Sequence, residues 1–140
     1  DDLLIVHANP RDLLQVIFPN EDHQRKLFGQ IRQGDDELEP LLMGVRASMI
    51  AFGHLHIPGL RYWDDISLAN ISSVSFPGDG DPRAKYAIAR WHESRRWEVE
   101  FFRVSYPMQD EIRAFKERKP PGWKRSIKAL REHGLISQVV

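Results

Sequence analysis

The order of apolar and polar positions predicts two buried strands followed by two β-hairpins. Consecutive apolar residues make residues 3–8 a short buried strand and residues 48–53 a second one. The first hairpin turns at two aspartates, Asp64 and Asp65, and the second pairs residues 85–92 with residues 96–104. The last strand should bury one face and leave the other wet, because apolar residues alternate with glutamates at Trp97, Glu98, Val99, Glu100 and Phe101.

Helices are predicted where apolar residues recur every three or four positions. Residues 10–33 are expected to be largely helical with a break at "FPNED", where Asn20 or Asp22 can cap a second helix. Residues 35–47 place four apolar side chains on one helix face, namely Leu38, Leu41, Leu42 and Val45. Residues 108–119 and 122–133 form two amphipathic helices, with Trp123, Ile127 and Leu130 on one face of the second and Gly134 at its stop position. The predicted fold class is α/β, with a mixed or antiparallel sheet.

Composition indicates the class of protein and its compartment but does not indicate a specific function. At 140 residues, with 41% hydrophobic and 29% charged residues, the chain fits one ordinary soluble domain. Twenty basic residues balance twenty acidic ones, so no overall field attracts nucleic acid or a membrane, and the basic excess in residues 109–133 suits a solvated helix face at least as well as a binding patch. Because cysteine is absent, any metal must be bound by imidazole, carboxylate, amide or water, and a reducing cytoplasm is the expected compartment.

Three histidines come at the ends of the two predicted buried strands. His54 and His56 follow the second strand in an H-x-H spacing between Gly53 and Pro58, and His7 ends the first strand. Neutral imidazole is a common ligand of divalent transition metals, and ligands gather at strand ends in α/β sheets. A partial metal site is therefore one interpretation. A stable domain without metal is another, with His7 bonded to a backbone carbonyl in the core. The remaining histidines lie in polar contexts and are expected at the surface: His23, His92 and His133.

Four motifs stand in a fixed order over roughly residues 3–90. They are "HANPRD" at 7–12, "GHLHIP" at 53–58, "NISS" at 70–73 and "DGDPRAKYA" at 79–87. In this order they resemble the second half of the calcineurin-like metallophosphoesterases, and most closely their small bacterial and archaeal phosphodiesterase branch. Several motifs in the correct order are far more specific than H-x-H alone.

The resemblance implies a sandwich of two sheets flanked by helices, of which this chain is the C-terminal half. Residues 1–106 would belong to that half domain, and residues 107–140 would be a helical extension packed on it. The implied cofactors are two divalent metal ions (manganese, iron or zinc), with one ion bound by His7 and His54 and the other by His56. The implied reaction is hydrolysis of a phosphate ester, a phosphodiester first of all, with three candidate substrate contacts: Asn9, Arg11 and Arg83.

The first half of such a domain carries an Asp-x-His motif, a Gly-Asp with the bridging carboxylate and a Gly-Asn-His motif, in that order. This ordered set does not occur here: Asp-x-His and Gly-Asn-His are absent from the sequence, and each Gly-Asp pair comes after the first matching strand. We therefore expect the carboxylate ligands to come from an N-terminal half outside this chain. Three imidazoles without a bridging carboxylate compensate two divalent cations poorly, so the chain alone should bind metal weakly and be a very poor catalyst. Within the matching half, Ala8 stands in place of the usual glycine, and residues 71–72 and 76–78 depart from Pro-Gly and Gln-Pro-Arg.

A non-catalytic scaffold on the same fold is the alternative function. The two departures at residues 71–72 and 76–78, the candidate exposed aromatics Tyr62 and Trp63, and the basic C-terminal helices fit it. The expected partners are a phosphate-ester substrate and the missing N-terminal half, and no membrane is expected. A nucleic acid substrate and a homo-oligomer both stay open.

Overall fold

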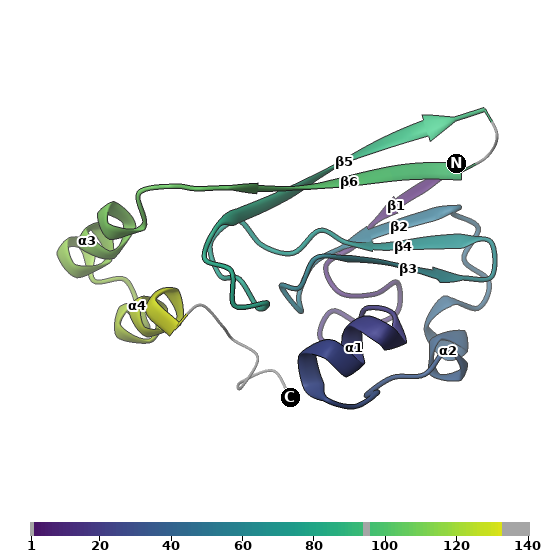
Figure 1. The fold of residues 1–140 in the computed structure, drawn as a ribbon, viewed down its shortest axis with the longest axis horizontal. Coiled ribbons are helices and arrows are strands. Elements are labelled where there is room, and N and C mark those ends of the chain that lie inside the picture. The colour runs from purple at the N-terminus through teal and green to yellow at the C-terminus, as the bar shows by residue number, and fades with distance from the viewer. Residues whose placement is uncertain (1, 94–95, 133–140) are drawn as a thin grey trace.

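A computed structural model describes residues 2–93 and 96–132. Its ribbon is drawn in Figure 1. Along the chain the elements are β1 (Leu3–Ile5), α1 (Glu21–Phe28), a short 3₁₀ helix (Asp36–Leu38), α2 (Glu39–Leu42), β2 (Met49–Phe52), β3 (Gly59–Trp63), β4 (Ile66–Asn70), β5 (Ala84–His92), β6 (Arg96–Val104), α3 (Met108–Arg118) and α4 (Trp123–Glu132).

A four-stranded mixed sheet forms the centre of the fold, in the order β1-β2-β4-β3. β1, β2 and β4 run parallel, and β3 joins β4 as the predicted antiparallel hairpin. Ile50 in β2 lies between Leu4 in β1 and Leu68 in β4. Because the three parallel strands share a direction, their carboxyl ends meet at one edge of the sheet, which is where ligands bind in such sheets.

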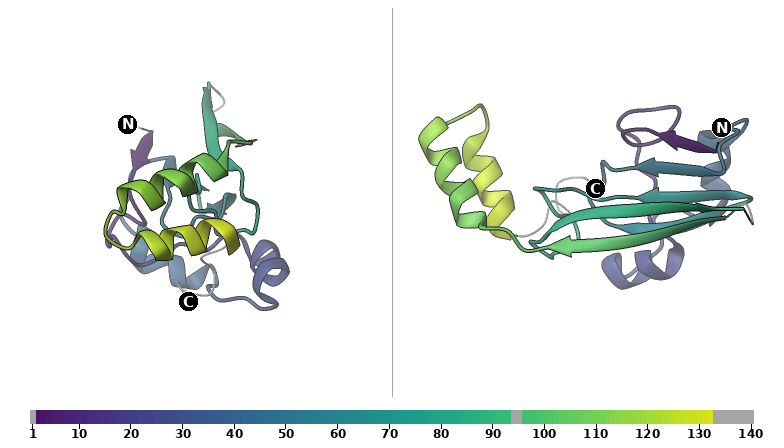
Figure 2. Two further views of the ribbon diagram at one scale, coloured as in Figure 1. Left: turned by 90° about the vertical axis from the view of Figure 1, so that its left-hand side faces the viewer. Right: turned by 90° about the horizontal axis from the view of Figure 1, so that it is seen from above.

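The central sheet is covered on both faces, which explains why β2 is apolar throughout. Ile50 and Phe52 face a core shared with the short helices after α1, whereas Met49 and Ala51 face the second layer. That layer is the two-stranded β5–β6 hairpin, and Figures 1 and 2 show it lying along the sheet opposite α1 and α2. Its inward side chains include Trp97 and Val99, as the alternating pattern predicts.

The first strand is shorter and more exposed than predicted. β1 covers only residues 3–5 and forms the outer edge of the sheet. Leu3 and Ile5 are 41% and 73% exposed, while Leu4 packs against the helix-side core. The prediction of a buried strand over residues 3–8 was wrong in this respect, because an edge strand has a neighbour on one side only.

Residues 10–20 are not helical, contrary to the prediction for residues 10–33. The Asn9 carboxamide oxygen accepts hydrogen bonds from the backbone N–H groups of Arg11 and Asp12, and the Asp12 carboxylate accepts from Leu14 and Gln15. Such local bonds offer the backbone an alternative to helix. The helix begins only at Glu21, where the Asn20 side chain caps it as predicted. In residues 35–47 the helical part is also short, and it buries Leu38, Leu41 and Leu42.

The two C-terminal helices pack against each other beyond the end of the β5–β6 hairpin (Figures 1 and 2). Their shared core contains Ile112, Ile127 and Leu130, with Trp123 and Phe76 packed against it. Phe76 comes from the loop before β5, so the helices contact the rest of the chain there. The predictions for His133, for Gly134 and for the hairpin turn at residues 94–95 lie outside the described residues. No helix in the described part is long and apolar enough to cross a membrane.

Candidate metal centre

His7 and His54 converge at the carboxyl edge of the central sheet. His7 follows the end of β1 by two residues, and His54 follows the end of β2 by two residues. The His7 Nε2 atom lies 2.9 Å from the His54 Nδ1 atom, and the two rings meet edge to face at 4.8 Å. At this distance the two nitrogens can share one proton, and both can also lie within bonding distance of a single ion. The parallel register of β1 and β2 thus brings together two of the three predicted ligands.

The backbone around the histidines is strained. His54 and His56 both have φ of 59°, in the left-handed region that non-glycine residues rarely adopt. The Leu55 N–H donates to the Gly53 carbonyl at 2.7 Å, which closes a three-residue turn around His54. Such conformations cost about 1–3 kcal/mol each and persist where surrounding contacts fix them, often at binding sites.

The histidine turn, defined here as residues 53–57, is fixed by three residues: Asn70 at the end of β4, and Ser72 and Gly78 in the loop between β4 and β5. The His56 carbonyl accepts hydrogen bonds from the Ser72 hydroxyl and from the Gly78 N–H, both at 2.8 Å. The Asn70 amide donates to the Gly53 carbonyl at 3.0 Å, and its oxygen accepts from the Ser72 N–H at 2.9 Å. Sequence reasoning gave these three residues no role at the site. The signal available in the sequence was Ser72, which stands where the resembling family has glycine. The structure explains that glycine, because the φ of Ser72 is 76°.

His56 presents a buried nitrogen that nothing in the described chain satisfies. Its Nδ1 atom is buried and has no hydrogen-bond partner there. Burial is the main cause that lowers the pKa of His56, and the nearby His54 and His7 lower it further. A hydrogen-bonding interaction with the Phe76 backbone acts in the opposite direction and raises the pKa. The neutral ring is therefore favoured, and a neutral imidazole with an open buried nitrogen is the form that binds a metal ion.

The distance between His7 and His54 fits the binding of one metal ion by both rings. Two nitrogens that bind one ion at about 2.0–2.1 Å lie no more than about 4 Å apart, and His7 and His54 meet this limit. Across residues 2–93 and 96–132, no three side chains of His, Cys, Asp or Glu gather as a metal-binding group. Asp12 adds negative charge nearby: backbone N–H groups of Leu14 and Gln15 lower its pKa first, and His54 lowers it further. His7 and His54 thus offer two nitrogens that one ion could share.

The predicted substrate contacts have partners of their own within the chain. Asn9 is buried, and its side chain holds the local turn and donates to the Gln15 carbonyl at 2.6 Å. Arg11 is exposed and donates to the Met43 carbonyl at 2.5 Å. Arg83 forms a bidentate ion pair with Asp81, in the loop before β5. All three side chains therefore have hydrogen-bond or ion-pair partners within the chain, and their role as substrate contacts stays a prediction.

The other two described histidines lie apart from this site. His92 is exposed on the β5–β6 hairpin and lies 3.1 Å from a Glu98 carboxylate oxygen, so the prediction of a surface residue is confirmed. His23 in α1 is half-buried, and the same prediction was wrong for it. The reason is that its ring lies close against Gly59, so that a side chain at that position would meet the imidazole.

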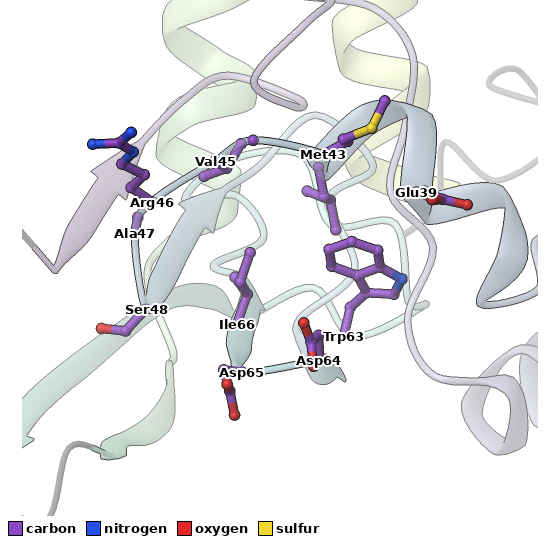
Figure 3. Close-up of a pocket in the computed structure, with 12 residues that line it drawn as sticks. Glu39, Met43, Val45, Arg46, Ala47, Ser48, Trp63, Asp64, Asp65 and Ile66 are labelled. Atoms are coloured by element: carbon purple, nitrogen blue, oxygen red, sulfur yellow. The ribbon is translucent and has the colours of Figure 1, made fainter.

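A surface cavity of about 400 Å³ occupies the opposite edge of the sheet. Figure 3 shows its lining, including Arg46, Trp63 and the hairpin aspartates Asp64 and Asp65. Ser48 precedes β2 and Ile66 begins β4, whereas the histidines follow the strand ends. The cavity therefore lies at the amino ends of the parallel strands and the histidines lie at their carboxyl ends, so the cavity is not part of the histidine site.

Comparison with known proteins gives a likeness of fold. No protein-family model matches the chain, and no curated protein matches it in sequence. A crystal structure of a metallophosphoesterase from Sphaerobacter thermophilus superposes with a TM-score of 0.68 at 21% identity, covering 94% of this chain and 55% of that one. A hypothetical protein from Pyrococcus horikoshii OT3 superposes with a TM-score of 0.69 at 19% identity, covering 94% of this chain and 46% of that one. This chain therefore spans about half the length of these proteins. The predicted fold class is confirmed.

Proposed function

We propose, from a fold shared with a metallophosphoesterase, that this chain supplies the histidine ligands of a binuclear metal site that hydrolyses phosphodiesters. His7 and His54 would bind one divalent ion and His56 the other. The carboxylate ligands would come from the part of the domain that the longer structural relatives have and this chain does not. Manganese, iron and zinc all suit such a mixed set of nitrogen and oxygen ligands.

The observation that carries the proposal is the convergence of His7 Nε2 and His54 Nδ1 at 2.9 Å. The two residues are 47 positions apart in sequence, so their meeting is a product of the fold. Two further observations support it. The strained backbone at His54 and His56 is held by several independent hydrogen bonds, and the buried His56 Nδ1 atom has no partner among the described residues.

When bound, two divalent ions orient a phosphate ester, acidify a water molecule and stabilise the charge of an in-line displacement. The chain's own contribution is to present neutral imidazoles in fixed directions. The lowered pKa of His56 keeps its ring neutral near pH 7, so no proton competes with a metal there. Of the predicted substrate contacts, Arg11 is the leading candidate to bind a phosphate oxygen, since its exposed guanidinium contacts a neutral carbonyl, whereas Arg83 is paired with the Asp81 carboxylate.

Metal binding tests the ligand assignment directly. We expect isothermal titration with Mn²⁺ to detect weak binding to the chain, and His54→Ala to abolish it because the convergent pair is broken. His92→Ala is the matched control, since His92 is an exposed histidine on the hairpin away from the strand ends. Equal Mn²⁺ binding by His54→Ala and the unaltered chain would refute the assignment.

Activity requires the longest natural polypeptide that contains this sequence. With Mn²⁺ present, it should hydrolyse bis-p-nitrophenyl phosphate, and a chelator should stop the reaction. The variants His54→Ala and His56→Ala should both lose activity, because each ion needs its own histidine ligand. If the unaltered polypeptide binds Mn²⁺ but hydrolyses no aryl phosphodiester or monoester, the enzymatic part of the proposal fails.

A non-catalytic interaction module is the second candidate, and the exposed Tyr62 favours it. Tyr62 is 60% exposed on β3, the outer strand of the central sheet, where an aromatic side chain is available to a partner. Trp63, by contrast, is half-buried and packs against the core. Partner binding that resists a chelator and is lost in Tyr62→Ala, without hydrolysis by the long polypeptide, would favour this function over the enzyme.

A further inference from the structure

Lys85 is a buried cation that the proposed chemistry does not use. It is the second residue of β5, and its side chain is 1% exposed. Its ammonium contacts three oxygens of the preceding loop: an Asp79 carboxylate oxygen at 2.9 Å, the Asp81 carbonyl at 2.7 Å and the Arg83 carbonyl at 3.2 Å. An ammonium group has three N–H donors, so all of them are used. Lys85 therefore ties several points of the loop to the start of β5.

A second cation secures the same loop from the neighbouring strand. Arg103 in β6 lies directly opposite Lys85 in the hairpin register. Its guanidinium pairs with Asp79 at 3.4 Å and with Asp81 at 3.1 Å. The Lys85–Asp79 pair is largely removed from water, because Asp79 is itself only 9% exposed, whereas Arg103 and Asp81 are partly exposed. Ion pairs thus fix the loop over residues 76–83 to the hairpin at Asp79 and Asp81, while Phe76 packs against the C-terminal helices.

The same loop touches the histidine turn, backbone against backbone, at Gly78. The Gly78 N–H donates to the His56 carbonyl at 2.8 Å. A Cβ atom at Gly78 would lie 2.7 Å from the Leu55 carbonyl and 3.1 Å from the His56 carbonyl, so only glycine allows this approach. The Lys85 backbone N–H also donates to the Ser73 carbonyl at 3.2 Å. Ser73 follows Ser72, whose hydroxyl is the other donor to the His56 carbonyl.

We propose that Lys85 is a positioning residue for His56, acting through the loop that contacts the histidine turn. Both donors to the His56 carbonyl depend on segments that Lys85 anchors, one through its ammonium and one through its N–H. Without the ammonium, Gly78 is free to withdraw, and the strained φ at His56 loses a contact that maintains it. The effect on the shape of the turn is independent of any metal. The effect on metal affinity rests on the proposed function.

The test compares two variants that each remove one buried cation. Lys85→Met keeps the apolar stem and removes three donors. Arg61→Met is the matched control, because Arg61 is also 3% exposed and pairs with Asp35, but its contacts lie at Phe18 and Gln33 rather than at the loop. The metal-free chain is measured by amide hydrogen exchange at Gly78 and by the nuclear magnetic resonance signal of the His56 ring. In Lys85→Met we expect exchange at Gly78 to quicken about tenfold or more and the ring signal to shift.

In Arg61→Met we expect the unfolding midpoint to fall while both signals at the histidine turn stay unchanged. If the two variants affect Gly78 and His56 equally, Lys85 acts through general stability and the proposal is wrong. Should Lys85→Met fail to fold, Asp79→Asn decides by the same two measurements, since it weakens the same network and preserves the shape of the side chain.

Titration with Mn²⁺ completes the experiment. Loss of a residue that orients a ligand lowers metal affinity about 10–100-fold, and we expect this of Lys85→Met but not of Arg61→Met. If the unaltered chain binds no Mn²⁺, the proposed function loses its metal site while the exchange and ring measurements still decide the role of Lys85. An unchanged Mn²⁺ affinity in Lys85→Met, beside normal binding by the unaltered chain, would overturn the role of Lys85 in metal binding.

Discussion

Replacing Ser72 by glycine and by alanine separates two effects that the structure combines at one residue. The Ser72 hydroxyl donates to the His56 carbonyl at 2.8 Å, and its backbone has φ of 76°. Both substitutions remove the hydrogen bond, but only glycine adopts this φ without a steric penalty. The pair of variants therefore measures how much backbone strain the site holds at Ser72.

The magnitudes follow from these contacts. Loss of the hydroxyl should cost about 0.5–1.5 kcal/mol, the usual net value of one hydrogen bond. The cost is no larger because the His56 carbonyl still accepts a hydrogen bond from Gly78. A left-handed conformation costs a non-glycine residue roughly 1–2 kcal/mol, part of which glycine returns through the greater entropy of its unfolded chain. Ser72→Ala should thus be destabilised by about 1 kcal/mol, and Ser72→Gly should be more stable than Ser72→Ala by about 1 kcal/mol.

Urea denaturation followed by circular dichroism gives the free energy of unfolding of each variant. Ser67 in β4 provides the control, because it is buried in a strand and its φ is not positive. There the order should reverse, with glycine less stable than alanine by about 0.5–1 kcal/mol. If Ser72→Gly is no more stable than Ser72→Ala, the positive φ stores no strain and the argument for an over-determined histidine turn fails.

Two further predictions concern stability. Arg61→Met should lower the free energy of unfolding by about 1.5–3 kcal/mol in urea denaturation, because it removes the hydrogen bonds of a buried cation to the Phe18 carbonyl and to Gln33, and a loss under 1 kcal/mol would contradict this. Burial is the main cause that lowers the pKa of His23 in the folded state, so the unfolded chain binds its proton more readily. The contribution of His23 to folding stability is therefore fully present above the unfolded pKa of 6.5 and is lost as the pH falls through the lower folded pKa. His23→Gln should make the free energy of unfolding less dependent on pH between about 7.5 and 5. If the free energy of unfolding depends on pH in His23→Gln as it does in the unaltered chain, the pKa of His23 is the same in the folded and unfolded states and the argument is wrong.

Much of the architecture is readable from local pattern. The continuous apolar run of β2, the alternation along β6 and the amphipathic α3 and α4 were all predicted with the correct type. The errors came where short polar side chains bond to nearby backbone. Asn9 and Asp12 convert residues 10–20 from predicted helix into turns, and this competition depends on side-chain geometry that apolar periodicity does not report.

The sequence by itself determined which residue types are present at the strand ends: His7, His54 and His56, with no cysteine as a competing ligand. Tertiary structure decided which of them meet. The 2.9 Å approach of His7 to His54 follows from the parallel pairing of β1 with β2, a contact between residues far apart in the chain. Asn9 and Arg83 carry equally suitable groups, but the fold commits Asn9 to a turn and Arg83 to an ion pair.

The residues that hold the histidine turn in place also come together only in the tertiary structure. Ser72 and Gly78 lie six residues apart in the loop between β4 and β5, and both donate to the single carbonyl of His56. Lys85 reads in sequence as one polar residue in an alternating strand, and its burial appears only when the hairpin and the loop before it fold together. Local pattern fixes the types of side chain and the elements that carry them. Their directions depend on strand register and on long-range hydrogen bonds, which form only when the whole sheet is assembled.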